Sequence, residues 1–386
     1  MLDKIYFDNA ATTPIHPKVK EKILPYLSDY FGNPSSIHSY GRIIRVAIEE
    51  AREIIADFIN ADASEIYFTS GGTEADNFAI FGISKTEFTE SGRNKIITSK
   101  SEHHAVLDSF EELGKSGFNT EYVGVNQYAQ LNVSELEKTL DSGTSLVAAM
   151  HTNNETGALN SIRLITELTK RNKSYIHVDA VQGFAKNRID VKNFGFDSMA
   201  ASAHKFYGPK GVGFLYAKSG TPLSPLLYGG SQERNRRGGT ENIVGIVGLA
   251  EAVKIADLEM ETNNQIVSDL KKYFIEGINS ISLDEFDINT KEDTSPYILS
   301  VTLKSEYYRV DPEAMLMFLD INGVAASNGA ACTSGTLKPS HVMLSAGKSI
   351  EDASGTIRFS FNPNNTKSEI DYTIDVLKKL RPNFVK

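Results

Sequence analysis

Short apolar runs alternate with helical or Gly/Pro-bearing segments through the first half of this chain. An amphipathic helix is predicted over residues 44–58, because apolar residues recur there at helical spacing. The runs expected to form strands are 66–69, 95–99, 146–151, 175–179, 198–202 and 212–217. This alternation predicts an α/β fold in which helices flank a large, mostly parallel sheet.

The pattern changes after the Gly- and Arg-rich stretch 228–240, where a long helical pattern starts near Glu241. Beyond that helix, a smaller α+β unit is expected from the runs 297–303, 311–322 and 355–361. We place the main boundary inside the long helix. The large domain then comprises residues 15–257, and the small domain comprises residues 1–14 and 258–386.

Composition narrows the classes of function. A net charge of -9 with 23% charged residues is ordinary for a globular protein and gives no sign of a nucleic-acid partner. The chain has no apolar run of about 18 residues and its start lacks the apolar run of a signal peptide, so we expect a cytoplasmic protein with no membrane partner. Its single cysteine, Cys332, cannot form an internal disulfide, which leaves packing or chemistry at the sulfur. The histidines are spread over separate elements, and no metal site is expected.

Lys205 stands at a position where open α/β sheets bind ligands. It follows the predicted strand 198–202, and the Gly/Pro-bearing turn after it would hold the lysine at the carboxyl end of that strand. Burial and neighbouring positive charge there would lower the pKa of the amine enough for a Schiff base with an aldehyde cofactor. A solvated surface lysine is the usual alternative for any single lysine.

Two further features favour a pyridine cofactor that carries a phosphate. Asp179 ends the apolar run 175–178, and an acid placed there would keep a pyridine nitrogen protonated. The alternative is that Asp179 caps the segment 180–182. Gly71-Gly72-Thr73 lies between a predicted strand and a predicted helix, where it offers free N–H groups, a hydroxyl and a helix dipole to a phosphate. The same tripeptide is also a plain helix start.

Ten blocks of sequence together resemble one enzyme family. In chain order they are FDNAATTP (7–14), FGNPSSIHSYGR (31–42), TSGGTEADN (69–77), SEHHAVLDS (101–109), MHTNNETG (150–157), HVDAVQ (177–182), SAHKFYGPKG (202–211), QERNRRGGTEN (232–242), SNGAACTSGTLKPSH (327–341) and TIRFSF (356–361). They resemble the NifS/IscS-type cysteine desulfurases, which are fold-type I, class V aminotransferase-like enzymes. The resemblance implies an enzyme that uses pyridoxal 5′-phosphate to take sulfur from L-cysteine, leaving alanine and a persulfide on Cys332.

The resemblance also assigns cofactor contacts. It implies that Lys205 forms the Schiff base, that Asp179 meets the pyridine nitrogen and that Gln182 meets the phenolic oxygen. His103 would stack on the pyridine ring and shuttle protons. The other implied cofactor residues are Gly72, Thr73, Ser202, His204, Asn154 and Thr240. Thr240 would reach the phosphate of a neighbouring subunit, which implies a homodimer.

The resemblance also implies residues for substrate binding and sulfur transfer, of which Arg358 and Cys332 lie in the small domain. Arg358 would bind the substrate carboxylate as a planar bidentate donor, with amide hydrogen bonds from Asn154 and Asn33. Without the family, Arg358 would be interpreted as half of a surface ion pair. Cys332 lies in a Gly-rich stretch, and a thiolate that collects sulfur in the site and delivers it to another protein needs a loop that moves. A buried, inert cysteine is the alternative.

Several points stay open at this level. The sulfur acceptor is an iron–sulfur scaffold or another carrier, for iron–sulfur cluster assembly or another thio-cofactor. A selenocysteine lyase or an aminotransferase for a small amino acid would use the same scaffold. A sulfur-carrier or assembly protein that has lost the reaction is a third alternative. The residues that weigh against it are Lys205, Asp179, His103 and Arg358.

Overall fold

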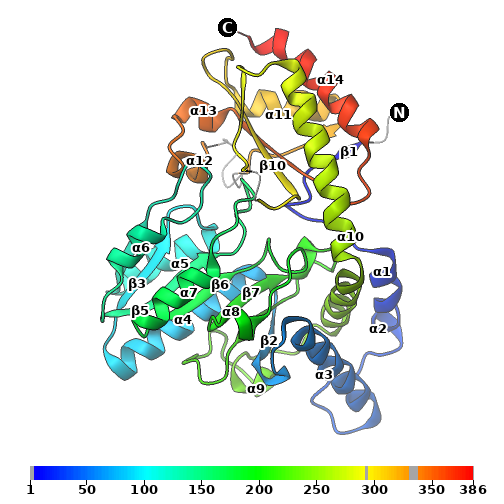
Figure 1. The fold of residues 1–386 in the computed structure, drawn as a ribbon. Coiled ribbons are helices and arrows are strands. Elements are labelled where there is room, and N and C mark those ends of the chain that lie inside the picture. The colour runs from blue at the N-terminus through cyan, green and yellow to red at the C-terminus, as the bar shows by residue number, and fades with distance from the viewer. Residues whose placement is uncertain (1–3, 292–293, 330–337, 386) are drawn as a thin grey trace.

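A seven-stranded sheet forms the centre of the larger lobe, the lower one in Figure 1. A computed structural model describes residues 4–291, 294–329 and 338–385. Within these residues the strand order is β2-β8-β7-β6-β5-β3-β4, and β8 alone runs antiparallel to its neighbours. The strands are β2 (Ile66–Thr69), β3 (Lys95–Ser99), β4 (Asn119–Val123), β5 (Thr144–Met150), β6 (Tyr175–Asp179), β7 (Ser198–Ser202) and β8 (Gly213–Ala217). The prediction of a mostly parallel sheet is confirmed.

Helices cover both faces of this sheet, because its central strands bury side chains on both sides. Along β5, Val147 and Ala149 join one apolar cluster, while Leu146 and Ala148 join another. This alternation is the two-residue period of a strand. The helices of the lobe are α1 (Pro17–Ile23), α2 (Pro25–Ser28), α3 (Ser39–Ile59), α4 (Gly72–Ser91), α5 (His104–Lys115), α6 (Val133–Thr139), α7 (Ile162–Arg171), α8 (Val191–Phe194) and α9 (Gln232–Asn235), with 3-10 turns η1 (Ala63–Glu65) and η2 (Ala203–Lys205). The predicted helix 44–58 lies within α3.

The smaller lobe has its own antiparallel sheet, in the order β12-β10-β9, and a short parallel pair, β1-β11. A separate apolar cluster fills this lobe, and in it Phe7 stacks on Phe274 with ring centroids 5.7 Å apart. The N-terminal segment therefore belongs with the C-terminal part of the chain, as Figure 1 shows. The elements are β1 (Ile5–Tyr6), β9 (Phe286–Ile288), β10 (Ile298–Leu303), α11 (Pro312–Ile321), β11 (Val324–Ala325), α12 (His341–Ser345), α13 (Ile350–Ser354), β12 (Thr356–Ser360) and α14 (Lys367–Phe384).

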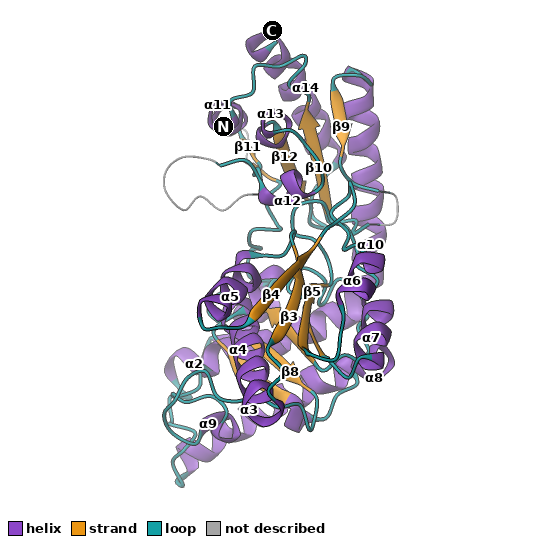
Figure 2. Ribbon diagram, turned by 90° about the vertical axis from the view of Figure 1, so that its left-hand side faces the viewer, coloured by secondary structure: helices purple, strands orange, loops and turns teal. Residues whose placement is uncertain are grey.

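Helix α10 (Ile243–Ile281) runs from one lobe into the other (Figure 1). Residues up to Ile255 pack into the core of the larger lobe, and residues from Val267 onward pack into the core of the smaller one. Figure 2, turned by a quarter, shows the two lobes stacked along this helix. The division of the chain at residue 257 stays a prediction. None of the described helices combines the length and the apolarity that crossing a membrane requires.

Two strands of the large sheet depart from the sequence predictions. The edge strand β4 was not expected, since only Val123 of its five residues is buried and the strand mixes polar with apolar residues. The last strand of the large sheet, β8, is antiparallel, whereas alternating strands and helices predict parallel neighbours. Only ten residues separate β7 from β8, which suits a tight return and leaves no room for a crossover helix.

Candidate active site

A cavity of about 360 Å³ lies at the carboxyl edge of the large sheet, between the two lobes. Parallel strands end together there, so side chains far apart in the sequence meet. The cavity is lined by these residues predicted from the sequence: Gly72, Thr73, His103, Asn154, Asp179, Gln182, Ser202, His204, Lys205 and Arg358. Asn33 and Thr240 are exposed and do not line it. Cys332 lies outside the described residues.

Lys205 is placed by strand β7 and the 3-10 turn η2 that follows it directly. Its Nζ donates hydrogen bonds to the carbonyl oxygens of Ala10, at 2.7 Å, and Ala11, at 3.0 Å. Burial lowers the pKa of Lys205 to about 8, and the positive charge of Arg358 adds to this shift. A lysine in this state carries a sizeable neutral fraction near neutral pH, and the neutral amine is the form that attacks an aldehyde.

Asp179 is the last residue of β6, the strand next to β7. One carboxylate oxygen accepts a hydrogen bond from the N–H of Val181 at 2.9 Å. Residues 181–183 form a turn and no helix, so Asp179 closes an Asx-type turn and does not cap a helix. Burial raises the pKa of Asp179, and the nearby His103 and Lys205 partly oppose that rise. A buried carboxylate facing the cavity favours a cationic partner there.

The start of α4 forms a cradle for an anion at one end of the cavity. Gly71 has φ 156° and ψ −172°, a conformation confined almost entirely to glycine. A Cβ on Gly72 would stand 2.5 Å from Cγ2 of Val181, so only glycine fits there without a shift. The first N–H groups of a helix have no carbonyl partner within it and point outward. With Thr73, Ser202 and His204 on the same cavity, the donor set fits a phosphate group.

His103 is the N-cap of α5, where its Nδ1 accepts a hydrogen bond from the N–H of Ala105 at 3.1 Å. Burial lowers the pKa of His103, so the neutral ring predominates at neutral pH. With Nδ1 accepting, the proton of the neutral ring sits on Nε2. His103 therefore has one ring nitrogen committed to the helix and the other available for proton transfer.

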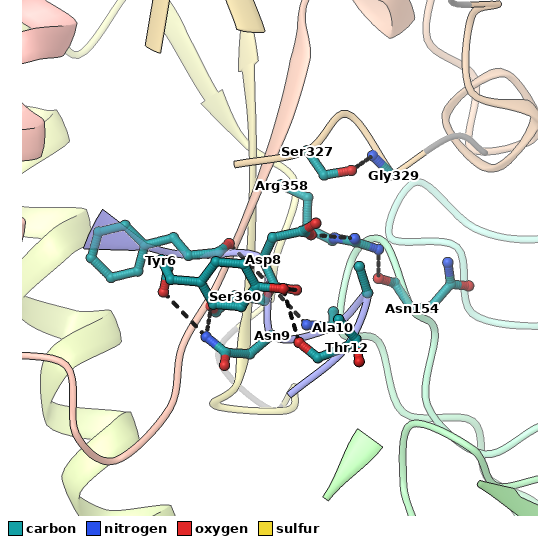
Figure 3. A network of polar contacts seen from close by, with 12 residues as sticks. Tyr6, Asp8, Asn9, Ala10, Thr12, Asn154, Ser327, Gly329, Arg358 and Ser360 are labelled. Carbon is teal, nitrogen blue, oxygen red and sulfur yellow. Dashed lines mark hydrogen bonds and ion pairs between the residues drawn. The ribbon is translucent and has the colours of Figure 1, made fainter. Parts of the chain in front are cut away.

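Arg358, on β12, brings a buried guanidinium from the smaller lobe to the cavity (Figure 3). Its Nη1 donates to the backbone oxygen of Asn154 at 2.9 Å, and its Nη2 donates to Asp8 Oδ1 at 2.9 Å. The guanidinium Nε is buried and has no partner within the described residues. Arg358 is 5% exposed, which rules out the alternative of a surface ion pair. An incompletely satisfied buried cation suits a carboxylate ligand.

Sequence reasoning assigned no role to several residues that complete the site. Asp8 and Ala10 come from the N-terminal segment, and no local signal connects them with Arg358 or Lys205. Glu155 is buried in the cavity wall and accepts a hydrogen bond from Ser340, and burial raises its pKa to about 7. His341 also lines the cavity and contacts the backbone oxygen of Glu102. Among the described residues no group of His, Cys, Asp or Glu side chains is arranged to hold a metal ion.

The two lobes, the lysine after β7 and the acid at the end of β6 define a fold-type I transferase. The sequence profile described as Aminotransferase class-V matches residues 5–373. This chain belongs to the class-V aminotransferase family and, within it, to the cysteine desulfurases of the NifS/IscS type. The resemblance drawn from the ten sequence blocks is confirmed.

Two curated relatives and two solved structures illustrate the likeness. Cysteine desulfurase IscS of Dictyoglomus turgidum (strain DSM 6724 / Z-1310) is 43% identical over 381 residues, covering 98% of this chain and 95% of that protein. Putative cysteine desulfurase IscS 1 of Bacillus subtilis (strain 168) is 44% identical over 385 residues, covering 98% of this chain and 100% of that protein. The solved structure of a NIFS-like protein matches with a TM-score of 0.89 at 34% identity, covering 98% of this chain and 99% of that one. The solved structure of SspA in complex with cysteine matches with a TM-score of 0.82 at 33% identity, covering 94% of this chain and 100% of that one.

Proposed function

We propose that this chain is a cysteine desulfurase that uses pyridoxal 5′-phosphate to convert L-cysteine to L-alanine and transfers the sulfur to Cys332. One observation carries the proposal: the amine of Lys205, the carboxylate of Asp179 and the guanidinium of Arg358 face one cavity from both lobes. A covalent anchor, an acid for a ring nitrogen and a carboxylate receptor are the three polar elements that the reaction needs.

The cofactor would be held from four sides. Lys205 would bind its aldehyde carbon covalently, Asp179 would pair with the protonated ring nitrogen, and Gln182 would meet the phenolic oxygen. The phosphate would take the cradle formed by Gly72, Thr73, Ser202 and His204. When bound, this group withdraws electrons from the Cα of an amino acid attached to it. Burial lowers the pKa of His204 to about 4, so His204 would serve there as a neutral hydrogen-bond donor.

The substrate's carboxylate would bind to Arg358, with the amide of Asn154 beside it and Asn33 as a further predicted contact. SspA, a structural neighbour of this chain, was solved in complex with cysteine. Arg358 already bonds the backbone oxygen of Asn154, so its guanidinium is held beside that residue before substrate arrives. Preorganised donors of this kind lose little entropy when the ligand binds.

Proton transfer would fall to Lys205 and His103. Both have pKa values below those of the free side chains, because both are buried. Lys205, once released from the cofactor, would take the Cα proton, and His103 or Lys205 would return a proton to the carbon that loses sulfur. Cys332 would form the new S–S bond as the C–S bond of the substrate breaks, so the sulfur leaves as a persulfide and the carbon skeleton leaves as alanine.

The proposal also includes a homodimer and an acceptor protein for the sulfur. Thr240 would reach the phosphate in a second copy of the chain, so the active form is a homodimer. The persulfide would pass to an acceptor protein, either an iron–sulfur scaffold or another carrier, in the cytoplasm. Neither a nucleic acid nor a membrane is required as a partner.

The test is a product balance with cysteine as the sole amino acid and a thiol reductant present. We expect alanine and sulfide in equal amounts with no keto acid added. An aminotransferase would need a keto acid, and a sulfur carrier without the reaction would stay colourless on addition of pyridoxal phosphate. A kcat/KM for selenocysteine far above that for cysteine would instead identify a selenocysteine lyase.

A further inference from the structure

Lys186 is a buried lysine that the proposed reaction does not use. It is 7% exposed, and its Nζ donates a hydrogen bond to Oε1 of Gln182 at 3.2 Å. The same nitrogen stands 5.2 Å from the ring centroid of Tyr297, in the smaller lobe. No carboxylate pairs with Lys186 among the described residues. Burying an amine without an ionic partner costs free energy. The hydrogen bond to Gln182 is therefore the side-chain interaction that offsets part of this cost.

That acceptor, Gln182, is held at both ends of its amide. While Oε1 accepts from Lys186, Nε2 donates to the carbonyl oxygen of Ala10 at 2.7 Å. The oxygen of Ala10 also accepts from Nζ of Lys205 at 2.7 Å. A chain of hydrogen bonds thus leads from Lys186 through Gln182 to the oxygen that holds the amine of Lys205.

The orientation of the Gln182 amide follows from the chemistry of its neighbours. The two ends of an amide have nearly the same shape, so hydrogen bonding alone decides which end faces which group. Burial lowers the pKa of Lys186 to about 7, and below that pH its ammonium form offers hydrogens only. The carbonyl of Ala10 accepts only. The reversed amide would put two donors together at Lys186 and two acceptors together at Ala10.

We infer that Lys186 is a positioning residue that keeps the NH₂ end of Gln182 turned toward the Lys205 side of the cavity. The inference rests on the proposed function, in which Gln182 meets the phenolic oxygen of pyridoxal phosphate. With the amide in this orientation, Gln182 presents a donor to that oxygen and favours its ionised form. Without Lys186, only the carbonyl of Ala10 opposes the reversed amide. The carbonyl end of Gln182 then faces the phenolic oxygen more often and disfavours its ionised form.

A purely structural role for Lys186 is the competing explanation. Its backbone oxygen accepts a hydrogen bond from Asn264 Nδ2 at 2.9 Å, and its side chain packs on Tyr297, so Lys186 also helps to join the two lobes. Loss of such packing would lower the melting temperature, but would leave the ionisation of a bound cofactor unchanged. The two roles are therefore separated by spectroscopy of the loaded protein.

The experiment is a pH titration of the visible absorbance of the protein loaded with pyridoxal phosphate, without substrate. Wild type is compared with Lys186→Met, which keeps length and packing, and with Lys186→Arg, which restores donors. We expect Lys186→Met to raise the midpoint pH by about one unit, the size of one hydrogen bond to a charged group. Lys186→Arg should return the midpoint most of the way. If the Met variant does not fold, Lys186→Gln replaces it. Because the amide of glutamine is a weaker donor than the amine of lysine, the midpoint should still rise, but by less.

A double-mutant cycle shows whether Lys186 acts through Gln182. In a Gln182→Ala background, Lys186→Met should leave the midpoint unchanged. The inference is overturned if Lys186→Met titrates like wild type, or if it shifts the midpoint equally with and without Gln182. A wild-type protein that binds no pyridoxal phosphate would instead overturn the proposed function, so the two failures are distinguishable.

Discussion

The side-chain amine of Lys205 lies 2.7 Å from the backbone oxygen of Ala10, 195 residues earlier in the chain. The N-terminal segment that carries Ala10 packs with the smaller lobe, whereas Lys205 follows a strand of the larger one. Lys205 therefore lies at the interface between the larger and the smaller lobe. Its amine is already directed into the cavity that Asp179 and Arg358 share.

The first prediction concerns the acidity of Lys205. Since burial and Arg358 lower the pKa of Lys205 to about 8, the protein free of cofactor should take up pyridoxal phosphate faster as pH rises. Below pH 8 the rate should increase about tenfold per unit, following the neutral amine, and it should level off above. Stopped-flow absorbance measures this rate.

The Arg358→Gln variant tests whether the charge of Arg358 contributes to the lowered pKa of Lys205. Removal of the positive charge should move the midpoint of the rate profile to higher pH, because Arg358 lowers the pKa of Lys205. Arg188→Gln removes an exposed arginine that pairs with Asp257, and serves as the matched control with no expected shift. A midpoint near 10 in the wild type would show that Lys205 is not buried as described.

The second prediction concerns substrate binding by Arg358. Arg358→Gln should lower kcat/KM for cysteine about 10- to 100-fold, the loss expected for a hydrogen bond between charged groups. The yellow colour of the loaded protein should remain, since Arg358 is not proposed to hold the cofactor. Steady-state alanine formation measures the effect, again with Arg188→Gln as the control. An unchanged kcat/KM would remove Arg358 from substrate binding.

The third prediction concerns the phosphate cradle. Gly72→Ala places a Cβ 2.5 Å from Cγ2 of Val181, so the start of α4 has to shift. Overpacking of this kind should weaken binding of pyridoxal phosphate about tenfold or more, as measured by equilibrium dialysis. Adding Val181→Ala removes the clashing methyl group and should recover much of the affinity, with Val181→Ala alone as the control. Normal affinity in Gly72→Ala would place the phosphate elsewhere.

The fourth prediction concerns Cys332, which lies outside the described residues. The Cys332→Ala variant should keep its yellow cofactor and lose sulfide release from cysteine, because no thiolate remains to accept the sulfur. Absorbance and a sulfide assay on the same sample measure both properties. Undiminished release would exclude Cys332 from the reaction.

The sequence predicted the large sheet well where apolar runs end at a polar residue. Strands β2, β3, β6 and β7 begin and end where expected, because each is a buried run with a clear change of composition at its end. Edge strand β4 was not predicted, since Val123 is its only buried residue. The direction of β8 depends on the length of the connection from β7 and on no feature of the strand itself.

The site was predictable for those residues to which the family resemblance assigns a role. Lys205 and Asp179 also had a physical reason, being polar residues at the ends of apolar strands. The roles of Asp8 and Ala10 depend on contacts with residues 350 and 195 positions later in the chain, which no local pattern reveals. Asn33 and Thr240 stay predictions, because a single copy of the chain leaves both exposed and outside the cavity.

The most direct test of the whole account is to locate the covalent bond between protein and cofactor. Borohydride reduction of the protein loaded with pyridoxal phosphate, followed by digestion and mass spectrometry, identifies the modified lysine. We expect a single pyridoxylated peptide containing Lys205, and no labelling of Lys186. A label on any other lysine, or no label at all, would contradict the account.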